Sequence, residues 1–285
     1  MNSSRQVDIR RVGTSERTSL QDLVAVEEPL EVRVNRVPFA VIMRTPGADR
    51  ELAAGFLLAE DVIRASHELG AIEHCSDVDD HARQNTLNVT ILDDAVHRLS
   101  ARLAERRQVT MTSSCGLCGR RTIESLRSRA SRVQGNWAVS SALVCTLPGA
   151  LREAQALFHT TGGLHAAALF GRDGTLQVVA EDVGRHNAVD KVIGRRLLED
   201  ALPLDHSILV VSGRASFELV QKALLAGIPF VAAVSAPSSL AIDLAHDSRI
   251  TLCGFVRGGA FNVYAHPKRV TELARGAAQE LDAEN

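Results

Sequence analysis

The chain first shows a regular pattern of apolar and polar positions over residues 29–44. These positions alternate on both sides of Asn35 and Arg36, as they do in two half-buried strands joined by a tight turn. Residues 47–60 then change to apolar positions spaced three and four apart, which predicts a helix. We therefore expect the ordered part of the chain to open with a strand pair followed by a helix.

A second alternating segment, residues 85–92, predicts another strand. Asp93 and Asp94 follow it directly, and either carboxylate is suited to cap a helix that runs through Leu103. Together these elements predict a small N-terminal α+β domain over residues 21–107.

The second half of the chain has a different rhythm, because short apolar runs are each followed by a polar cluster and then a helical pattern. The three runs are residues 176–180, 207–211 and 230–234. This order is typical of βαβ units and predicts a largely parallel sheet. We therefore expect an α/β protein in which residues 136–285 form the larger, C-terminal domain.

Two further stretches show no such period. Residues 108–135 are rich in Thr, Ser, Gly and Arg, which predicts a mobile connector between the domains. Residues 1–20 carry several arginines and no apolar stretch of the kind found in secretory signals, so we expect a flexible tail.

The composition narrows the class of protein. The chain has 285 residues, 45% of them hydrophobic, which is enough to bury a core without covalent staples. Its 32 basic and 34 acidic residues give a net charge of -2, which argues against binding to nucleic acid or to a membrane surface. No apolar run reaches the roughly 18 residues that a membrane-spanning helix needs, because the best candidate, residues 223–237, is interrupted by Gly227, Pro229 and Ser235. The five cysteines are an odd and mostly scattered set, which favours a reducing cytoplasm over a disulfide framework.

Cys115 and Cys118 are the one close pair of cysteines, and they lie inside the predicted connector. Arg120, Arg121 and the amides of a helix expected to begin at Thr122 would favour the thiolate form. The pKa of a free thiol is about 8.5, so a shift of one to two units makes the nucleophile abundant at neutral pH. Two thiols this close can also displace a persulfide sulfur by forming a disulfide. The pair is therefore the candidate catalytic site.

Other interpretations of the pair remain open. A structural zinc site needs two more ligands, which His74 and Cys75 could supply from a distance. A thioredoxin-like redox pair would follow a strand directly, whereas polar residues precede Cys115. A zinc deaminase needs Pro before the first cysteine and a His-x-Glu element, and the chain has neither.

Polar clusters follow the strands that we expect in the C-terminal half, where helix N-termini and backbone amides can hold phosphates. They are residues 181–187, 212–216, 235–239 and 255–260, the last after a strand expected at 250–253. The candidate ligand-contacting residues within them are Gly184, Arg185, His186, Ser212, Gly213, Arg214, Phe255, Val256, Arg257, Gly258, Gly259 and Ala260. Turn geometry alone also enriches such loops in Gly and Ser, so their composition is weak evidence for a ligand site. The prediction of a phosphate site rests instead on the fact that all the clusters follow strands in the same way.

A further segment, residues 158–165, brings Gly162, Gly163 and His165 just before an apolar run. With no third metal ligand at clear spacing, a hydrogen-bonded or ligand-contacting histidine is favoured over a metal site. The helix expected after His186 carries Asp190 and Lys191. We expect both at solvated positions, with no chemical role.

These segments together resemble the formate dehydrogenase accessory sulfurtransferase family, FdhD, over nearly the whole chain from about residue 27 to residue 266. The resemblance rests on specific motifs in the right order. They are Glu27-Glu28-Pro29-Leu30, Ser113-Ser114-Cys115-Gly116-Leu117-Cys118-Gly119, Thr161-Gly162-Gly163-Leu164-His165, Glu181-Asp182-Val183-Gly184-Arg185-His186-Asn187, Ser212-Gly213-Arg214 and Arg257-Gly258-Gly259.

The resemblance implies a cytoplasmic sulfurtransferase that receives persulfide sulfur from a cysteine desulfurase. It implies that this sulfur passes to molybdenum bis(molybdopterin guanine dinucleotide), with GDP as a partial mimic, before that cofactor enters formate dehydrogenase. By the same likeness Cys115 is the persulfide intermediate, Cys118 its partner, and residues 255–260 part of the cofactor contact. It further implies a homodimer, and a larger domain similar to the cytidine deaminase fold without its zinc.

One alternative belongs to another class of protein. A non-catalytic chaperone could bind and shield the nucleotide cofactor, with the two cysteines serving only to sense redox state. The two hypotheses differ in whether Cys115 must carry sulfur.

Overall fold

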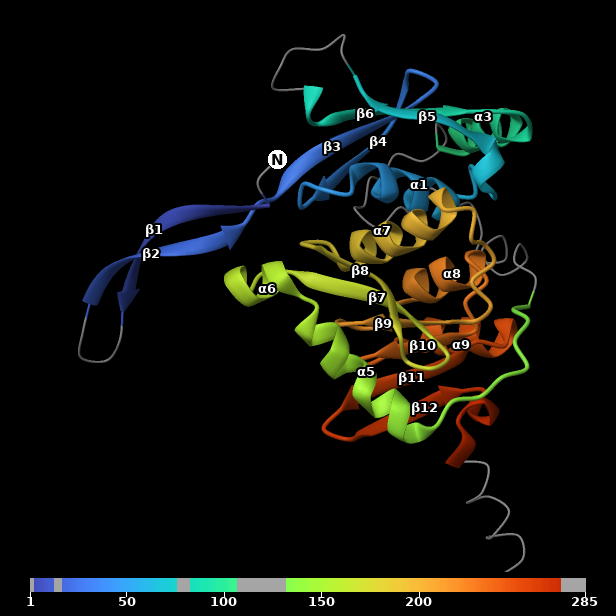
Figure 1. Ribbon diagram of the computed structural model, residues 1–285. Coiled ribbons are helices and arrows are strands. Elements are labelled where there is room, and N and C mark those ends of the chain that lie inside the picture. Colours follow the sequence, from blue (N-terminus) through green and yellow to red (C-terminus); the bar gives the residue numbers. More distant parts are fainter. Residues whose placement is uncertain (1–2, 13–16, 76–82, 107–131, 273–285) are drawn as a thin grey trace, which may run out of the picture.

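The computed structural model of the chain describes residues 3–12, 17–75, 83–106 and 132–272 (Figure 1). These residues form a smaller four-stranded sheet, a larger six-stranded sheet and a separate two-stranded hairpin. The combination is a mixed α/β fold, as the sequence predicts. The further likeness to the cytidine deaminase fold stays a prediction.

The four-stranded sheet has the order β4-β3-β6-β5 and carries the N-terminal helices. Its elements are β3 (Glu28–Val34), β4 (Val37–Arg44), α1 (Asp49–Ala59), the short 3-10 helix η1 (Ser66–Glu68), β5 (Leu69–His74), β6 (Thr86–Ile91) and α3 (Asp94–Arg106). The turn between β3 and β4 places Asn35 and Arg36 at φ values of 49° and 67°. The strand pair, both helices and the strand before α3 are thus confirmed close to their predicted positions.

The N-terminal residues differ from the flexible tail that the sequence predicts. β1 (Ser4–Val12) and β2 (Arg17–Ala25) pair antiparallel over their whole length and extend away from both sheets (Figure 1). The alternation of apolar and polar residues does not reveal this hairpin. Few of its side chains are buried against other elements, so polar residues occupy both of its faces.

The six-stranded sheet has the order β12-β11-β10-β9-β7-β8. Its strands are β7 (His165–Gly171), β8 (Leu176–Asp182), β9 (Ser207–Val211), β10 (Phe230–Ala233), β11 (Thr251–Arg257) and β12 (Ala260–Ala265). The helices around it are α5 (Ser141–Glu153), α6 (Ala156–Thr161), α7 (Arg185–Leu198), α8 (Phe217–Leu225), α9 (Ser239–Ser248) and the short 3-10 helix η3 (Pro267–Arg269).

The expectation of a largely parallel sheet is wrong in part. Strands β9, β10 and β11 run parallel, but β7 is antiparallel to both of its neighbours and β12 is antiparallel to β11. Two of the three antiparallel pairs arise because short turns join β7 to β8 and β11 to β12. As a result the carboxyl ends of β8, β9, β10 and β11 share one edge of the sheet with the amino end of β7.

Two layers of side chains cover the sheet, one on each face. Val144, Leu147 and Leu151 of α5 pack on one face with alternate residues of β7, β9 and β10. Helices α7, α8 and α9 cover the other face, and their core is continuous with that of the four-stranded sheet. None of the helices in the described ranges is long and apolar enough to cross a membrane.

Helices α1 and α7 cross with their backbones almost in contact, and two glycines make this possible. A Cβ atom added at Gly194 would lie 1.9 Å from the carbonyl oxygen of Glu51, and one at Gly55 would lie 2.0 Å from that of Asp190. The two sheets are therefore fastened together through this crossing. The domain boundaries at residues 20/21, 107/108 and 135/136 stay predictions.

Candidate functional site

The loops at the carboxyl edge of the large sheet are joined to one another and to β7 by hydrogen bonds. Ser212, after β9, exchanges two bonds with Ala166 of β7: its amide donates at 3.0 Å and its hydroxyl accepts at 2.9 Å. The amide of Ser235, after β10, donates to the carbonyl of Gly213 at 3.4 Å, and the amide of Phe255 in β11 donates to Ser235 at 3.2 Å. Loops far apart in sequence thus form one continuous edge.

Gly213, His165 and Arg185 meet at the centre of this edge. A Cβ atom added at Gly213 would lie 3.5 Å from Nδ1 of His165 and 3.7 Å from Cδ of Arg185. Partial burial lowers the pKa of His165 below its usual value, and the charges of Arg185 and His186 lower it further. Glycine therefore leaves the space in which a half-buried cation and a neutral imidazole approach each other.

Arg185 carries a buried donor without a partner. Its Nε atom is shielded from solvent and has no hydrogen-bond acceptor within the described part of the chain. Leaving a buried charged donor unsatisfied is unfavourable by about 1–3 kcal/mol or more, so such a group in a native structure calls for a ligand or water. An anion such as a phosphate would satisfy this donor after a change of the side-chain conformation that uncovers the nitrogen.

His186 takes a different part in the edge. Its Nε2 atom lies 2.7 Å from Oε2 of Glu218 and 3.1 Å from the hydroxyl of Ser216. Burial alone would raise the pKa of Glu218, but the hydrogen bond and charge of His186 lower it below the usual value. The imidazole therefore joins the start of α7 to the start of α8. Glu218 was not among the predicted site residues.

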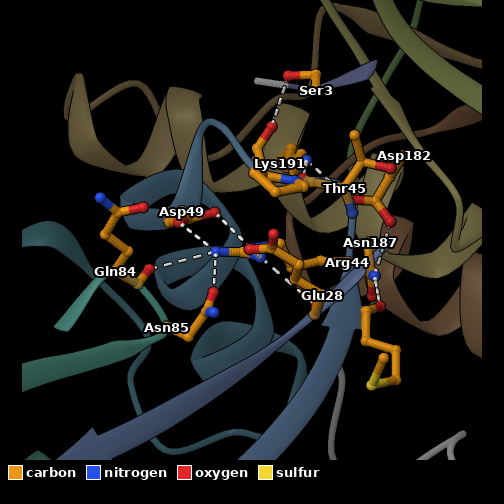
Figure 2. A network of polar contacts seen from close by, with 12 residues as sticks. Ser3, Glu28, Arg44, Thr45, Asp49, Gln84, Asn85, Asp182, Asn187 and Lys191 are labelled. Carbon is orange, nitrogen blue, oxygen red and sulfur yellow. Dashed lines mark hydrogen bonds and ion pairs between the residues drawn. The ribbon is translucent and has the colours of Figure 1, made fainter. Parts of the chain in front are cut away.

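A buried carboxylate, Asp182 (Figure 2), holds the turn that carries Arg185 and His186. Its Oδ1 atom accepts from the amide of Gly184 at 2.8 Å and from the side chain of Asn187 at 2.9 Å. Its Oδ2 atom accepts from the amide of Thr45 at 3.2 Å and pairs with Lys191 at 2.7 Å. Four donors thus fix the geometry of the β8–α7 turn.

The same network ties the site to the N-terminal sheet (Figure 2). The ammonium group of Lys191 also donates to the carbonyl of Thr45 at 2.9 Å. The neighbouring Arg44 is fully buried and pairs with Asp49 through two bonds of 3.0 Å each. Thr45 follows Arg44 directly, so the N-terminal sheet helps to position the start of α7.

The expectation that Asp190 and Lys191 are solvated is wrong. Their exposed fractions are 2% and 4%, and Asp190 pairs with Lys222 of α8 at 2.6 Å. Helix α7 is sandwiched between α1 and the large sheet, so even its charged positions are buried. A signal was present in the sequence, because apolar residues flank this charged pair on both sides over residues 188–193.

The predicted contact segment 255–260 is a hairpin rather than a loop after a strand. β11 continues to Arg257, beyond the predicted end at residue 253, and Gly258 and Gly259 form the turn with φ values of 61° and 76°. Nothing lies within 4 Å of a Cβ atom added at either glycine. The side chain of Val256 is fully buried in the core, so a ligand can reach only its backbone.

The remaining predicted residues lie at the margins of the edge. Arg214 is exposed, and the guanidinium of Arg257 lies 5.4 Å from the ring centre of Phe255. Gly162 ends α6 with a φ of 67°, and a Cβ atom at Gly163 would face Ala25 of β2 at 3.9 Å. Arg185, His186, Gly213 and His165 thus form the core of the site.

Cys115 and Cys118 lie outside the described residues. Of the cysteines that the structure describes, Cys253 is buried, and burial raises the pKa of its thiol to about 12. Such a thiol is protonated at neutral pH and cannot act as a nucleophile. Cys75 and Cys145 are partly exposed. No cluster of three or more His, Cys, Asp or Glu side chains in the described ranges could hold a metal ion.

Comparison with known proteins gives matches over most of the chain. The family described as FdhD/NarQ matches residues 25–271. A Streptomyces avermitilis protein named sulfur carrier protein FdhD is 48% identical over 266 residues, covering 90% of this chain and 92% of the relative. A protein of the same name from Sulfolobus acidocaldarius is 45% identical over 269 residues, covering 93% of this chain and 98% of the relative.

A solved structure shares the fold. The crystal structure of a protein assigned as a formate dehydrogenase accessory protein, from Desulfotalea psychrophila, superposes with a TM-score of 0.75 at 25% identity. The match covers 94% of this chain and 100% of that structure.

Proposed function

Because this chain belongs to the FdhD/NarQ family, we propose that it is a sulfur carrier for the maturation of formate dehydrogenase. Cys115 carries the sulfur as a persulfide, and the acceptor is a guanine-dinucleotide molybdenum cofactor held at the carboxyl edge of the large sheet. The binding of the cofactor at this edge is supported by one observation above all. The Nε atom of Arg185, beside Gly213, is buried and has no partner in the described part of the chain.

The residues of the edge suit an anionic nucleotide. Arg185 offers a charged donor from the first residue of α7, a helix whose N-terminal amides favour phosphate. Gly213 leaves room next to this guanidinium, and the hairpin turn at Gly258 and Gly259 exposes backbone to an approaching group. The substrate we propose is molybdenum bis(molybdopterin guanine dinucleotide), with GDP as its partial mimic.

The sulfur chemistry requires only thiols. The Cys115 thiolate attacks the outer sulfur of a persulfide on a cysteine desulfurase, and the donor's thiolate leaves with the electron pair of the broken S–S bond. One S–S bond breaks and one forms, so no external oxidant is needed. Cys118 then attacks Sγ of Cys115, which forms a disulfide and releases the outer sulfur as hydrosulfide for the acceptor. A cellular thiol reductant restores the pair, which places the cycle in a reducing cytoplasm.

Two further proposals complete this account. The protein acts as a homodimer, and the recipient of the sulfurated cofactor is formate dehydrogenase. The homodimer rests on the family alone, and the recipient rests on the family and on the name of the Desulfotalea psychrophila protein of known structure. The cytidine deaminase-like form of the larger domain is also proposed on the basis of the family alone.

Binding of GDP should depend on Arg185. Replacing it by alanine removes the charged donor from the edge, and we expect the affinity for GDP to fall by about tenfold or more. Arg257→Ala should weaken binding less, because that side chain is exposed. Isothermal titration calorimetry measures both effects without the cofactor itself.

Arg196→Ala is the matched control for this measurement. Arg196 lies on the same helix and also has a buried Nε atom without an acceptor in the described ranges. Its guanidinium pairs with Glu199, however, and it lies three turns from the edge. Its substitution should leave the affinity for GDP unchanged. Equal affinities of the Arg185→Ala and wild-type proteins would remove Arg185 from the site.

A further inference from the structure

A cavity lies at the amino-terminal edge of the large sheet, opposite the carboxyl edge. Its volume is about 770 Å³, and its walls come from the end of α9, the segment after β12 and residues 135–138. The cavity is separated from the carboxyl edge by the length of β11. It therefore takes no part in the site described above.

This cavity concentrates positive charge. Arg249, Lys268 and Arg269 line it together with His246 and His266, and no Asp or Glu occurs among the described residues of its wall. None of the three cations forms an ion pair with another described residue. The C-terminal end of α9 offers only about half a negative charge from its dipole. Roughly two and a half positive charges thus remain without a counter-charge in the wall.

Arg269 is held rigidly within this wall. Its Nε atom donates to the carbonyl of Gly135 at 3.1 Å, and Nη1 donates to the carbonyl of Arg249 at 2.7 Å and to the hydroxyl of Thr251 at 3.2 Å. Nη2 has no acceptor in the described part of the chain, and it is not shielded from solvent. Burial and the nearby charge of Arg249 lower the pKa of Arg269. Two cations are therefore held close together, which an anion between them would relieve.

Two histidines, His246 and His266, add ring nitrogens that can form hydrogen bonds to the wall of the cavity. Nε2 of His266 lies 2.9 Å from the carbonyl oxygen of His246, and because a carbonyl can only accept, this nitrogen carries the proton. The opposite ring nitrogen, Nδ1, has no partner among the described residues. The ring centres of the two histidines are 5.7 Å apart, so both rings belong to one group of polar side chains.

We propose that this cavity binds a phosphate-bearing anion, such as pyrophosphate or the phosphates of a nucleotide. A di- or polyphosphate places two to four negative charges within a few ångströms, which matches three cations in one cavity. An acidic peptide brings one charge per side chain and spreads it over a longer distance. Arg269 suits the role because its free Nη2 donors project from a guanidinium already fixed by three hydrogen bonds.

The chain contains its own reporter for this cavity. Trp137, the one tryptophan in the sequence, lines the cavity and stacks on Phe230 at a ring distance of 6.3 Å. We expect inorganic pyrophosphate to produce a saturable change in tryptophan fluorescence in the wild-type protein. The double variant Arg249→Gln with Lys268→Gln should bind at least about tenfold more weakly. Both side chains are exposed, so the fold should be retained.

Controls separate this cavity from the carboxyl edge. Arg185→Ala should keep the full fluorescence response to pyrophosphate and to GDP, while calorimetry shows only the loss of GDP binding at the carboxyl edge. Comparing pyrophosphate, GDP and guanosine by fluorescence identifies the source of the phosphate: GDP and pyrophosphate should both act, and guanosine should not. The proposal is overturned by the lack of a saturable response to millimolar pyrophosphate, by equal affinity of the double variant, or by tighter binding of hexaglutamate than of pyrophosphate.

Discussion

Substitution of Cys115 by alanine is expected to abolish uptake of sulfur by the protein. Wild-type protein incubated with a cysteine desulfurase and cysteine should gain the mass of one sulfur atom, detected by intact-mass spectrometry. The Cys115→Ala variant should gain none, because the persulfide needs this thiolate as its nucleophile. Loss of an essential nucleophile removes the reaction rather than slowing it, so the expected effect is complete.

Cys145→Ala is the matched control for that experiment. Cys145 is a partly exposed thiol of α5 and has no proposed role, so its removal should leave the mass gain intact. The buried Cys253 should not compete, because its thiol stays protonated near neutral pH. A persulfide that still formed in the Cys115→Ala variant would refute the assignment.

The same residues separate the sulfur carrier from the alternative of a cofactor-shielding chaperone. A cell that lacks the native protein is given the double variant Cys115→Ala with Cys118→Ala. The formate dehydrogenase that this cell makes should be inactive. If this double variant matured an active enzyme, the chaperone hypothesis would be correct and the cysteines would have no part in transfer.

Replacing Gly194 by alanine should destabilise the fold more than any surface substitution. The added Cβ atom would lie 1.9 Å from the carbonyl of Glu51 and 2.7 Å from the amide of Gly55. Both neighbours are backbone atoms of α1, so no side chain can rotate away, and the two helices must separate. We expect a loss of about 3 kcal/mol in the free energy of unfolding, measured by chemical denaturation.

Gly149→Ala provides the matched control, because it makes the same chemical change in another helix. Gly149 is exposed on α5, and nothing lies within 4 Å of an added Cβ atom. Alanine should therefore raise the stability there by about 1 kcal/mol through its higher helix propensity. Similar stabilities of the two variants would show that α1 and α7 do not cross as closely as described.

The sequence predicts most of the helices and strands that can be recognised from the spacing of apolar residues within one short segment. The β3–β4 pair, α1, β6 and α3 follow from apolar spacing, and so do the three strand-to-helix units from β8 to α9. It also predicts that polar loops gather at one edge, because the carboxyl ends of strands of the same direction meet there.

What the sequence leaves undecided depends on contacts between distant segments. The direction of β7 is set by its short turn into β8 and by pairing with β9, and neither is visible in periodicity. Burial of Asp190 and Lys191 arises from the packing of α1 on α7. The partner of His186, Glu218, lies 32 residues away, so no spacing rule identifies it.

The central claim is that sulfur on Cys115 reaches an acceptor held at the edge formed by Arg185 and Gly213. The most direct test loads the protein with sulfur-35 persulfide and adds the guanine-dinucleotide molybdenum cofactor. In the wild-type protein the label should move to the cofactor, while in the Arg185→Ala variant most of it should stay on Cys115. Transfer of the label at the same rate in both proteins would contradict the account.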